Sequence, residues 1–182
     1  ANLLNAQINQ RLLILKGLKT FAEMHITTNA EIEQAKFAPF AAGLMSGVPG
    51  IRNVAISPGG TILFIYPAEG NEALIGQDLI RDRRTQVRAD VQRAIRTRRV
   101  ILSGPYVARP KVLQLVARQA VYSGETAFWG LVSIECDIAP LFEEAALDPP
   151  PAGLSLLLQD RTNHVLTGEK AVLEGNPVLD KV

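Results

Sequence analysis

Cysteine and histidine are nearly absent from this chain of 182 residues. It has one cysteine and two histidines, with no Cys-x-x-Cys, His-x-x-x-His or His-Glu-x-x-His spacing. A zinc site is therefore not expected, and a lone cysteine excludes a disulfide within the chain. Cys136 lies in the apolar run 131–136, which favours a small buried hydrophobic side chain over a nucleophile.

Aromatic residues are also scarce, at 5%, and the net charge is only +1. Nucleic-acid binding usually needs a strongly basic surface or aromatic stacking platforms, so no nucleic-acid partner is expected. Arginines nevertheless gather between residues 81 and 99. They could form an anion-binding patch, but Asp78, Asp82 and Asp90 lie among them. The near-neutral balance favours a solvated helix face whose arginine stems cover apolar surface.

The motifs of common active sites are missing. There is no Gly-x-Ser-x-Gly element and no Gly-x-x-x-x-Gly-Lys loop, and His25 and His164 lie far apart in the sequence. We therefore expect no catalytic residues, no metal and no cofactor.

Long hydrophobic runs are absent as well. No stretch of about 18 apolar residues occurs, so no segment is predicted to span a membrane. The chain starts Ala1-Asn2-Leu3-Leu4, with neither an initiator Met nor the basic start of a signal peptide. We expect it to be an excerpt of a longer protein. Its 47% hydrophobic content suffices for one domain with a substantial core.

Hydrophobic periodicity divides the chain into helices and strands. Apolar residues recur every three or four positions from Leu4 to Ala22, which predicts a long helix over residues 2–27. A second helix is expected over 30–46, kinked or split at Pro39. The turn Pro58-Gly59-Gly60 predicts a hairpin. The remaining predicted elements are strands at 51–57, 61–66, 100–102, 112–121 and 128–137 and helices at 84–97 and 138–146.

This order predicts an α+β fold: a long N-terminal helix, then a five-stranded antiparallel sheet with helices, then a short C-terminal hairpin. The segment Asp148-Pro149-Pro150-Pro151-Ala152-Gly153 is the one convincing linker. Beyond it, residues 154–159 and 164–166 resemble a hairpin around Arg161-Thr162-Asn163. The predicted domains are a stalk or dimerisation helix (1–28), the domain that contains the sheet (29–148), and a linker with the start of a further subdomain (149–182).

Six short segments, in this order, resemble the CHASE family of extracytoplasmic sensor domains. The strongest runs from Tyr66 to Leu79, from a buried strand across a Pro/Gly loop toward the arginine-rich helix. A second, Leu102-Ser103-Gly104-Pro105-Tyr106, follows that helix. The other segments are 37–40, 49–53, 117–122 and 128–133.

The resemblance implies a PAS-like ligand-binding domain between two membrane helices absent from this sequence. In this family, such domains control histidine kinases, diguanylate cyclases or phosphodiesterases. The chain would then be the periplasmic or extracellular part of an inner-membrane protein. The implied partners are a small-molecule ligand, either adenine-like or another small metabolite, and a second copy bound through the N-terminal helix. In plant cytokinin receptors, the positions similar to Asp78, Leu102 and Ser103 contact the ligand.

The predicted ligand contacts lie between the sheet and the 67–80 segment. Arg118 is included because it lies mid-strand in an apolar run, and a buried arginine usually needs a carboxylate, either a ligand's or that of Asp78. Two alternatives stay open: a dimerisation module without a ligand, and a small hydrolase that depends on an acid such as Asp78. The candidate contacts are Tyr66, Asp78, Leu102, Ser103, Tyr106, Arg118 and Tyr122.

Overall fold

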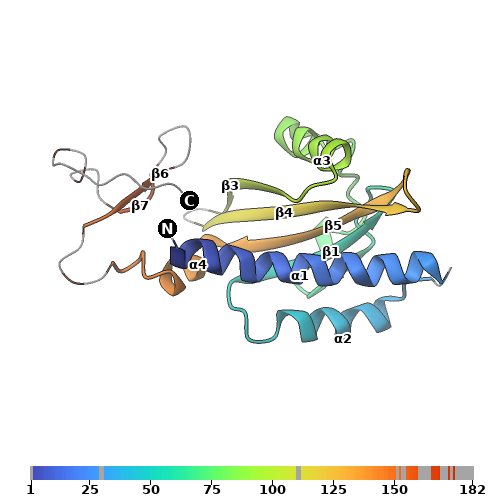
Figure 1. The fold of residues 1–182 in the computed structure, drawn as a ribbon, viewed down its shortest axis with the longest axis horizontal. Coiled ribbons are helices and arrows are strands. Elements are labelled where there is room, and N and C mark those ends of the chain that lie inside the picture. The colour runs from blue at the N-terminus through green and yellow to red at the C-terminus, as the bar shows by residue number, and fades with distance from the viewer. Residues whose placement is uncertain are drawn as a thin grey trace.

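A computed structural model of the chain describes residues 2–28, 31–109, 112–150, 152, 155–159, 165–168, 172 and 174. Its centre is a five-stranded antiparallel sheet in the order β2-β1-β5-β4-β3, with helices on both faces (Figure 1). This confirms the predicted α+β fold. The sheet strands are β1 (Ile51–Pro58), β2 (Phe64–Tyr66), β3 (Ile101–Arg109), β4 (Val112–Ser123) and β5 (Ala127–Asp137).

The N-terminal helices cover one face of the sheet. Helix α1 (Asn2–Thr27) runs along the strands, and Leu15, Leu18 and Ala22 are fully buried against them. Helix α2 (Gln34–Met45) lies beside α1 and completes the same apolar core. The predicted split at Pro39 is wrong, because α2 is one uninterrupted helix that contains this proline.

Helix α3 (Thr85–Thr97) lies on the opposite face of the sheet from α1 (Figure 1). Its predicted stripe packs toward the strands: Val87, Val91 and Ala94 are buried, and Ile95 is partly buried. The segment between β2 and α3 crosses the same face and contains a short 3-10 helix, η1 (Glu72–Leu74). Backbone hydrogen bonds from Ile62 to Gln77 and from Leu79 to Gly60 fix the end of this segment to the β1–β2 turn.

Strand β3 is longer than the predicted segment 100–102. The Gly104-Pro105 pair lies inside the strand, which continues past a register irregularity between Ser103 and Tyr106. Gly104 has a φ of +120° there, which glycine tolerates. Since β3 is the edge strand, its proline does not remove a ladder hydrogen bond from a central position.

Helix α4 (Ile138–Glu144) and the hairpin β6 (Leu157–Gln159) and β7 (Val165–Gly168) lie at the end of the domain where α1 begins (Figure 1). Leu4, Leu141 and Phe142 form a small buried cluster here, against which Leu158 and Leu166 pack. The predicted turn, with Arg161, Thr162, Asn163 and His164, lies outside the described residues. The proposed domain boundaries at 28 and 149 stay predictions.

Two glycines give a matched test of this packing. A Cβ at Gly130 would lie 2.5 Å from the Ser57 carbonyl oxygen of the neighbouring strand, whereas a Cβ at helical Gly43 would meet nothing within 4 Å. We expect Gly130→Ala to destabilise the domain by about 1–3 kcal/mol through overpacking. Gly43→Ala should stabilise it by about 0.5–1 kcal/mol, because alanine is the better helix former. Urea unfolding of both variants checks the opposite signs; equal effects would contradict this β1–β5 packing.

Candidate ligand-binding site

A layer of polar side chains lies on the α3 face of the sheet. Because side chains alternate along a strand, β4 directs Arg118 to this face and Ala117 toward α1. On β5, Ser133 is the direct cross-strand neighbour of Arg118, and Glu135 pairs in register with Asn53 of β1. All of these polar residues except the half-buried Glu135 are buried. We call this group, together with Ser103, Tyr106, Asn71 and Asp90, the polar layer.

Asp90 closes the polar layer from the helix side. It is 3% exposed, and its Oδ2 accepts hydrogen bonds from the Tyr106 hydroxyl at 3.0 Å and from Gln86 Nε2 at 3.1 Å. Its Oδ1 lies 3.3 Å from Arg93 Nη2 in an ion pair. The pKa of Tyr106 is raised, first by burial and then by its hydrogen bond to Asp90. The carboxylate is therefore fully engaged and fixes Tyr106 over the sheet.

A chain of amides ties the 67–71 loop to the centre of the sheet. Asn53 Nδ2 donates to Glu135 Oε2 at 2.9 Å and lies 3.1 Å from Asn71 Oδ1. Asn71 Nδ2 in turn donates to the Pro67 carbonyl oxygen at 3.0 Å. These bonds hold one end of the covering segment against β1 and β5.

Arg118 is the exception to this pattern of satisfied groups. It is 5% exposed, yet its Nε and Nη1 atoms have no hydrogen-bond partner. Burial lowers the pKa of Arg118, an effect opposed by the nearby Tyr106 and Glu135. The buried hydroxyl of Ser103 also makes no hydrogen bond of normal geometry, although it lies close enough to Tyr106 to act to lower the pKa of that phenol. Buried polar groups without partners are costly, so this cluster has unused binding capacity.

A surface groove of about 590 Å³ is lined by residues 76–78 and 81–84, which belong to the segment between β2 and α3. Its wall includes Asp82 and Arg84, which form a two-pronged ion pair at 2.7 and 2.9 Å. The hydrogen bond from Arg84 lowers the pKa of Asp82, and Arg118 adds to this effect. The same hydrogen bond to Asp82 raises the pKa of Arg84, and Glu135 and Tyr106 add smaller contributions. Charged groups of the groove and of the polar layer therefore affect one another's pKa values.

The structure brings together three of the predicted site residues, Ser103, Tyr106 and Arg118. Asp78 lines the groove above them, but its Oδ1 accepts the backbone N–H groups of Ile80 and Arg81 at 2.9 and 3.0 Å. It therefore stabilises a turn, and its role in ligand binding stays a prediction.

The other three predicted contacts lie apart from this cluster. The Tyr122 hydroxyl donates to the Ile95 carbonyl oxygen at 2.6 Å, near the end of α3, and its ring lies 4.4 Å from the Arg98 guanidinium. Tyr66 packs with the core under α1 and α2. Leu102 lines a narrow cavity against α1, on the face opposite Ser103. Their roles in ligand binding stay predictions.

Sequence reasoning missed five members of the polar layer: Asn53, Asn71, Asp90, Ser133 and Glu135. Asp90 was interpreted only as a partner for surface arginines. The available signal was the alternation in Ser133-Ile134-Glu135-Cys136, which places two polar residues on one face of an otherwise apolar strand.

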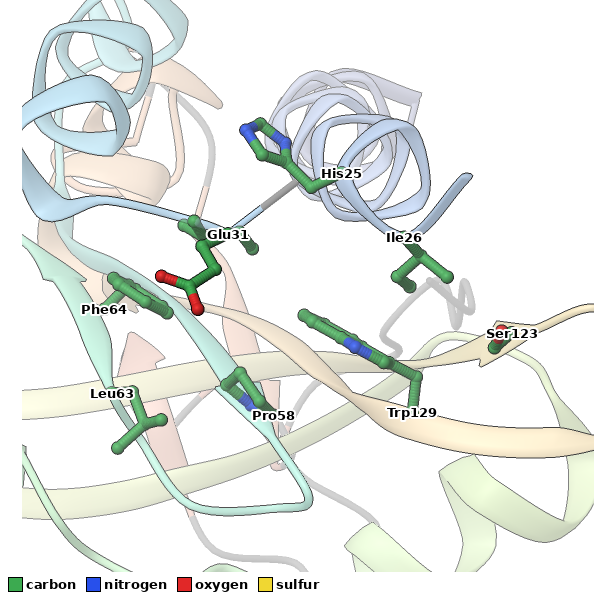
Figure 2. Close-up of a pocket in the computed structure, with 9 residues that line it drawn as sticks. His25, Ile26, Glu31, Pro58, Leu63, Phe64, Ser123 and Trp129 are labelled. Atoms are coloured by element: carbon green, nitrogen blue, oxygen red, sulfur yellow. The ribbon is translucent and has the colours of Figure 1, made fainter. Parts of the chain in front are cut away.

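A second hollow of about 510 Å³ lies on the α1 face of the sheet, near the C-terminal end of α1 (Figure 2). The Trp129 ring and the exposed Glu31 side chain both line it. His25 at its rim is already engaged, with Nδ1 2.9 Å from the Phe21 carbonyl oxygen. No buried unpartnered polar atom lines this hollow, so it is a weaker candidate than the polar layer.

Other kinds of site have less support among the described residues. Burial raises the pKa of Cys136 to about 12, so this thiol is protonated at neutral pH and is a poor nucleophile, as the sequence indicated. No group of three or more Cys, His, Asp or Glu side chains is placed to hold a metal in the described part of the chain. None of the described helices has both the length and the apolar character of a membrane span.

The CHASE domain family model matches residues 52–166, which is more than half of the chain. The chain therefore belongs to the CHASE family of sensor domains, and the resemblance seen in the sequence is confirmed. No curated protein matches the chain.

Solved structures with a similar fold are sensor domains of bacterial receptors. An extracellular ligand-binding receptor from Desulfohalobium retbaense DSM5692 has a TM-score of 0.63 at 17% identity, over 93% of this chain and 31% of that one. The sensory domain of the Campylobacter jejuni chemoreceptor Tlp3 scores 0.55 at 14% identity, over 99% and 74%. The ligand-binding domain of the Pseudomonas aeruginosa PAO1 amino acid chemoreceptor PctC scores 0.55 at 16% identity, over 88% and 66%. At these identities the likeness concerns the fold.

The role of Asp90 can be tested by comparing two acids in similar i,i+3 ion pairs. Asp90→Ala leaves the Tyr106 hydroxyl and Gln86 without their buried acceptor, so we expect a loss of about 1–3 kcal/mol. Glu33→Ala removes the partner of Lys36 in an exposed pair and should change stability little. Chemical denaturation measures both; equal effects would show that Asp90 does not organise the polar layer.

Proposed function

We propose that the chain is the extracytoplasmic small-molecule-sensing domain of a transmembrane signalling receptor. The observation that carries this proposal is the polar layer, with unpartnered groups on Arg118 and Ser103 in a chain of the CHASE family. A ligand that satisfies these groups would offset their burial cost. In this proposal the output is a histidine kinase, diguanylate cyclase or phosphodiesterase in another part of the receptor.

The ligand would lie between the sheet and the 67–84 segment, in contact with Ser103, Tyr106 and Arg118. The solved relatives support a small polar metabolite over an adenine-like compound. The Pseudomonas domain was solved with GABA, and the Campylobacter domain, in a structure with a TM-score of 0.51 and 14% identity, with L-valine.

Helix α1 would carry the signal and pair with a second copy of the chain. Three large apolar side chains remain on its surface: Leu3 is 58% exposed, Leu13 is 65% exposed and Met24 is 55% exposed. Leu13 and Met24 are 11 residues apart, about three helical turns, so they share one face, and Leu3 lies roughly 80° around the helix from Leu13. This stripe supports the predicted homodimer through the N-terminal helix.

Ligand binding is tested by thermal unfolding against amino acids, other carboxylates, adenines and small peptides. A ligand at about 100 times its Kd should add roughly 2.7 kcal/mol, or on the order of 5–10 °C in Tm. Ser103→Ala should reduce that shift, whereas Ser123→Ala, in the hollow of Figure 2, should preserve it. The reverse pattern would place the ligand in that hollow, and a flat panel would favour a dimerisation module without a ligand.

The dimer is tested by Leu13→Arg, with Ile75→Arg as the control. Ile75 is 46% exposed but lies in the 67–84 segment, away from α1. Burying an unpaired arginine in a helix interface is unfavourable, so Leu13→Arg should weaken dimerisation at least tenfold and Ile75→Arg should not. Sedimentation velocity across a concentration series measures this. An unchanged dimer in the Leu13→Arg protein would rule out this face.

A further inference from the structure

We infer that the ligand carries a carboxylate group and that the Arg118 guanidinium binds it. The inference rests on the proposed sensing function and narrows it to a class of ligand. It depends on the acidic neighbours of Arg118, none of which forms an ion pair with it.

Four carboxylates lie near Arg118 or in the groove above it, and none forms an ion pair with it. Asp90 accepts from Tyr106, Gln86 and Arg93. Asp82 pairs with Arg84, and Asp78 accepts two backbone N–H groups. Glu135 accepts a hydrogen bond from Asn53. Acids lie near Arg118, but none of these four supplies the direct ion-pair partner that a buried arginine ordinarily has.

The Arg118 guanidinium keeps unused hydrogen-bonding capacity inside the polar layer. Arg118 is 5% exposed, and both its Nε and Nη1 are without acceptors. The Ser103 hydroxyl, also buried and unpartnered, lies diagonally across the β3–β4 pair on the same face. A carboxylate has two oxygens and only accepts hydrogen bonds, so it can take bonds from the guanidinium and from a serine hydroxyl.

The surrounding charges favour a single negative charge on the ligand. Glu135 and Asp90 both lie within electrostatic reach of Arg118. One cation beside two acids can accommodate a monoanion, but a phosphate dianion would be repelled by both acids. The class is therefore a small carboxylate, not a phosphorylated compound.

The experiment uses acids and their matched amides on the folded domain. The acids are acetate, 4-aminobutanoate and L-valine; the amides are acetamide, 4-aminobutanamide and L-valinamide, with inorganic phosphate as a further anion. Arginine Nε–H signals are followed by ¹⁵N NMR at constant ionic strength. We expect at least one acid to shift the Arg118 Nε–H signal saturably, with its amide at least tenfold weaker. The exposed Arg96 should not respond.

The variant Arg118→Gln should abolish the Tm increase given by that acid, whereas Arg96→Gln should leave it unchanged. The NMR measurement on the unmodified domain remains decisive even where Arg118→Gln folds poorly. No Arg118 response to any of the acids, an equal response to the amides, or a stronger response to phosphate would overturn the inference. Tm increases given by neutral compounds alone would overturn it while the sensing function stands; no Tm increase with any compound would count against both.

Discussion

The packing of α1 against one face of the sheet is the contact on which the rest of the domain depends. Leu15, Leu18 and Ala22 are fully buried there, against Val54 and Val132 among others. Each large apolar side chain buried in this way contributes about 1.5–3 kcal/mol. Because this face supplies much of the hydrophobic stabilisation, the opposite face of the same strands can carry polar groups.

The α3 face accordingly divides into a part that anchors the helix and a part that is polar. Val87, Val91 and Ala94 attach α3 to the sheet through an apolar cluster that includes Leu131. The cost of Arg118 falls on the polar part, where a guanidinium is buried without a paired acid. If stability were the only requirement, replacing this buried charge with an apolar side chain would make the folded domain more stable. A retained, unpaired buried charge is therefore more informative about binding than the satisfied polar groups around it.

Local patterns predicted the elements and the antiparallel sheet, but not how far each strand runs. Hydrophobic periodicity located α1, α3 and the long strands, since each buries one face. The continuation of β3 past Gly104-Pro105 was missed because it depends on β4 pairing along an edge, a non-local contact. Pro39 failed to split α2 although an interior proline lacks its backbone donor; packing of Phe37 and Ala41 holds the helix together.

The same limit applies to the candidate site. Arg118 was predictable because a charge in the middle of an apolar strand is unusual. Asp90 and Asn53 were not, because they meet near Arg118 only through the strand order β1-β5-β4 and the position of α3. The family resemblance proposed both Leu102 and Ser103, yet consecutive strand residues point to opposite faces. The structure directs Ser103 to the polar layer and Leu102 toward α1.

Strand β4 contributes side chains to both faces of the sheet, so it could transmit a displacement from the polar layer to α1 in the proposed sensing function. Arg118 faces the polar layer, while its neighbour Ala117 and Val121 are buried in the core under α1. Close-packed interiors have little room to absorb a displacement, so a change in the position of β4 on ligand binding would be felt at α1. Near its start, α1 is held by Arg11, whose Nη2 lies 2.8 Å from Glu144 of α4 and donates to the Pro49 carbonyl oxygen at 2.7 Å. A shift of α1 would therefore move α4 with it, at the end of the domain where the β6–β7 hairpin packs.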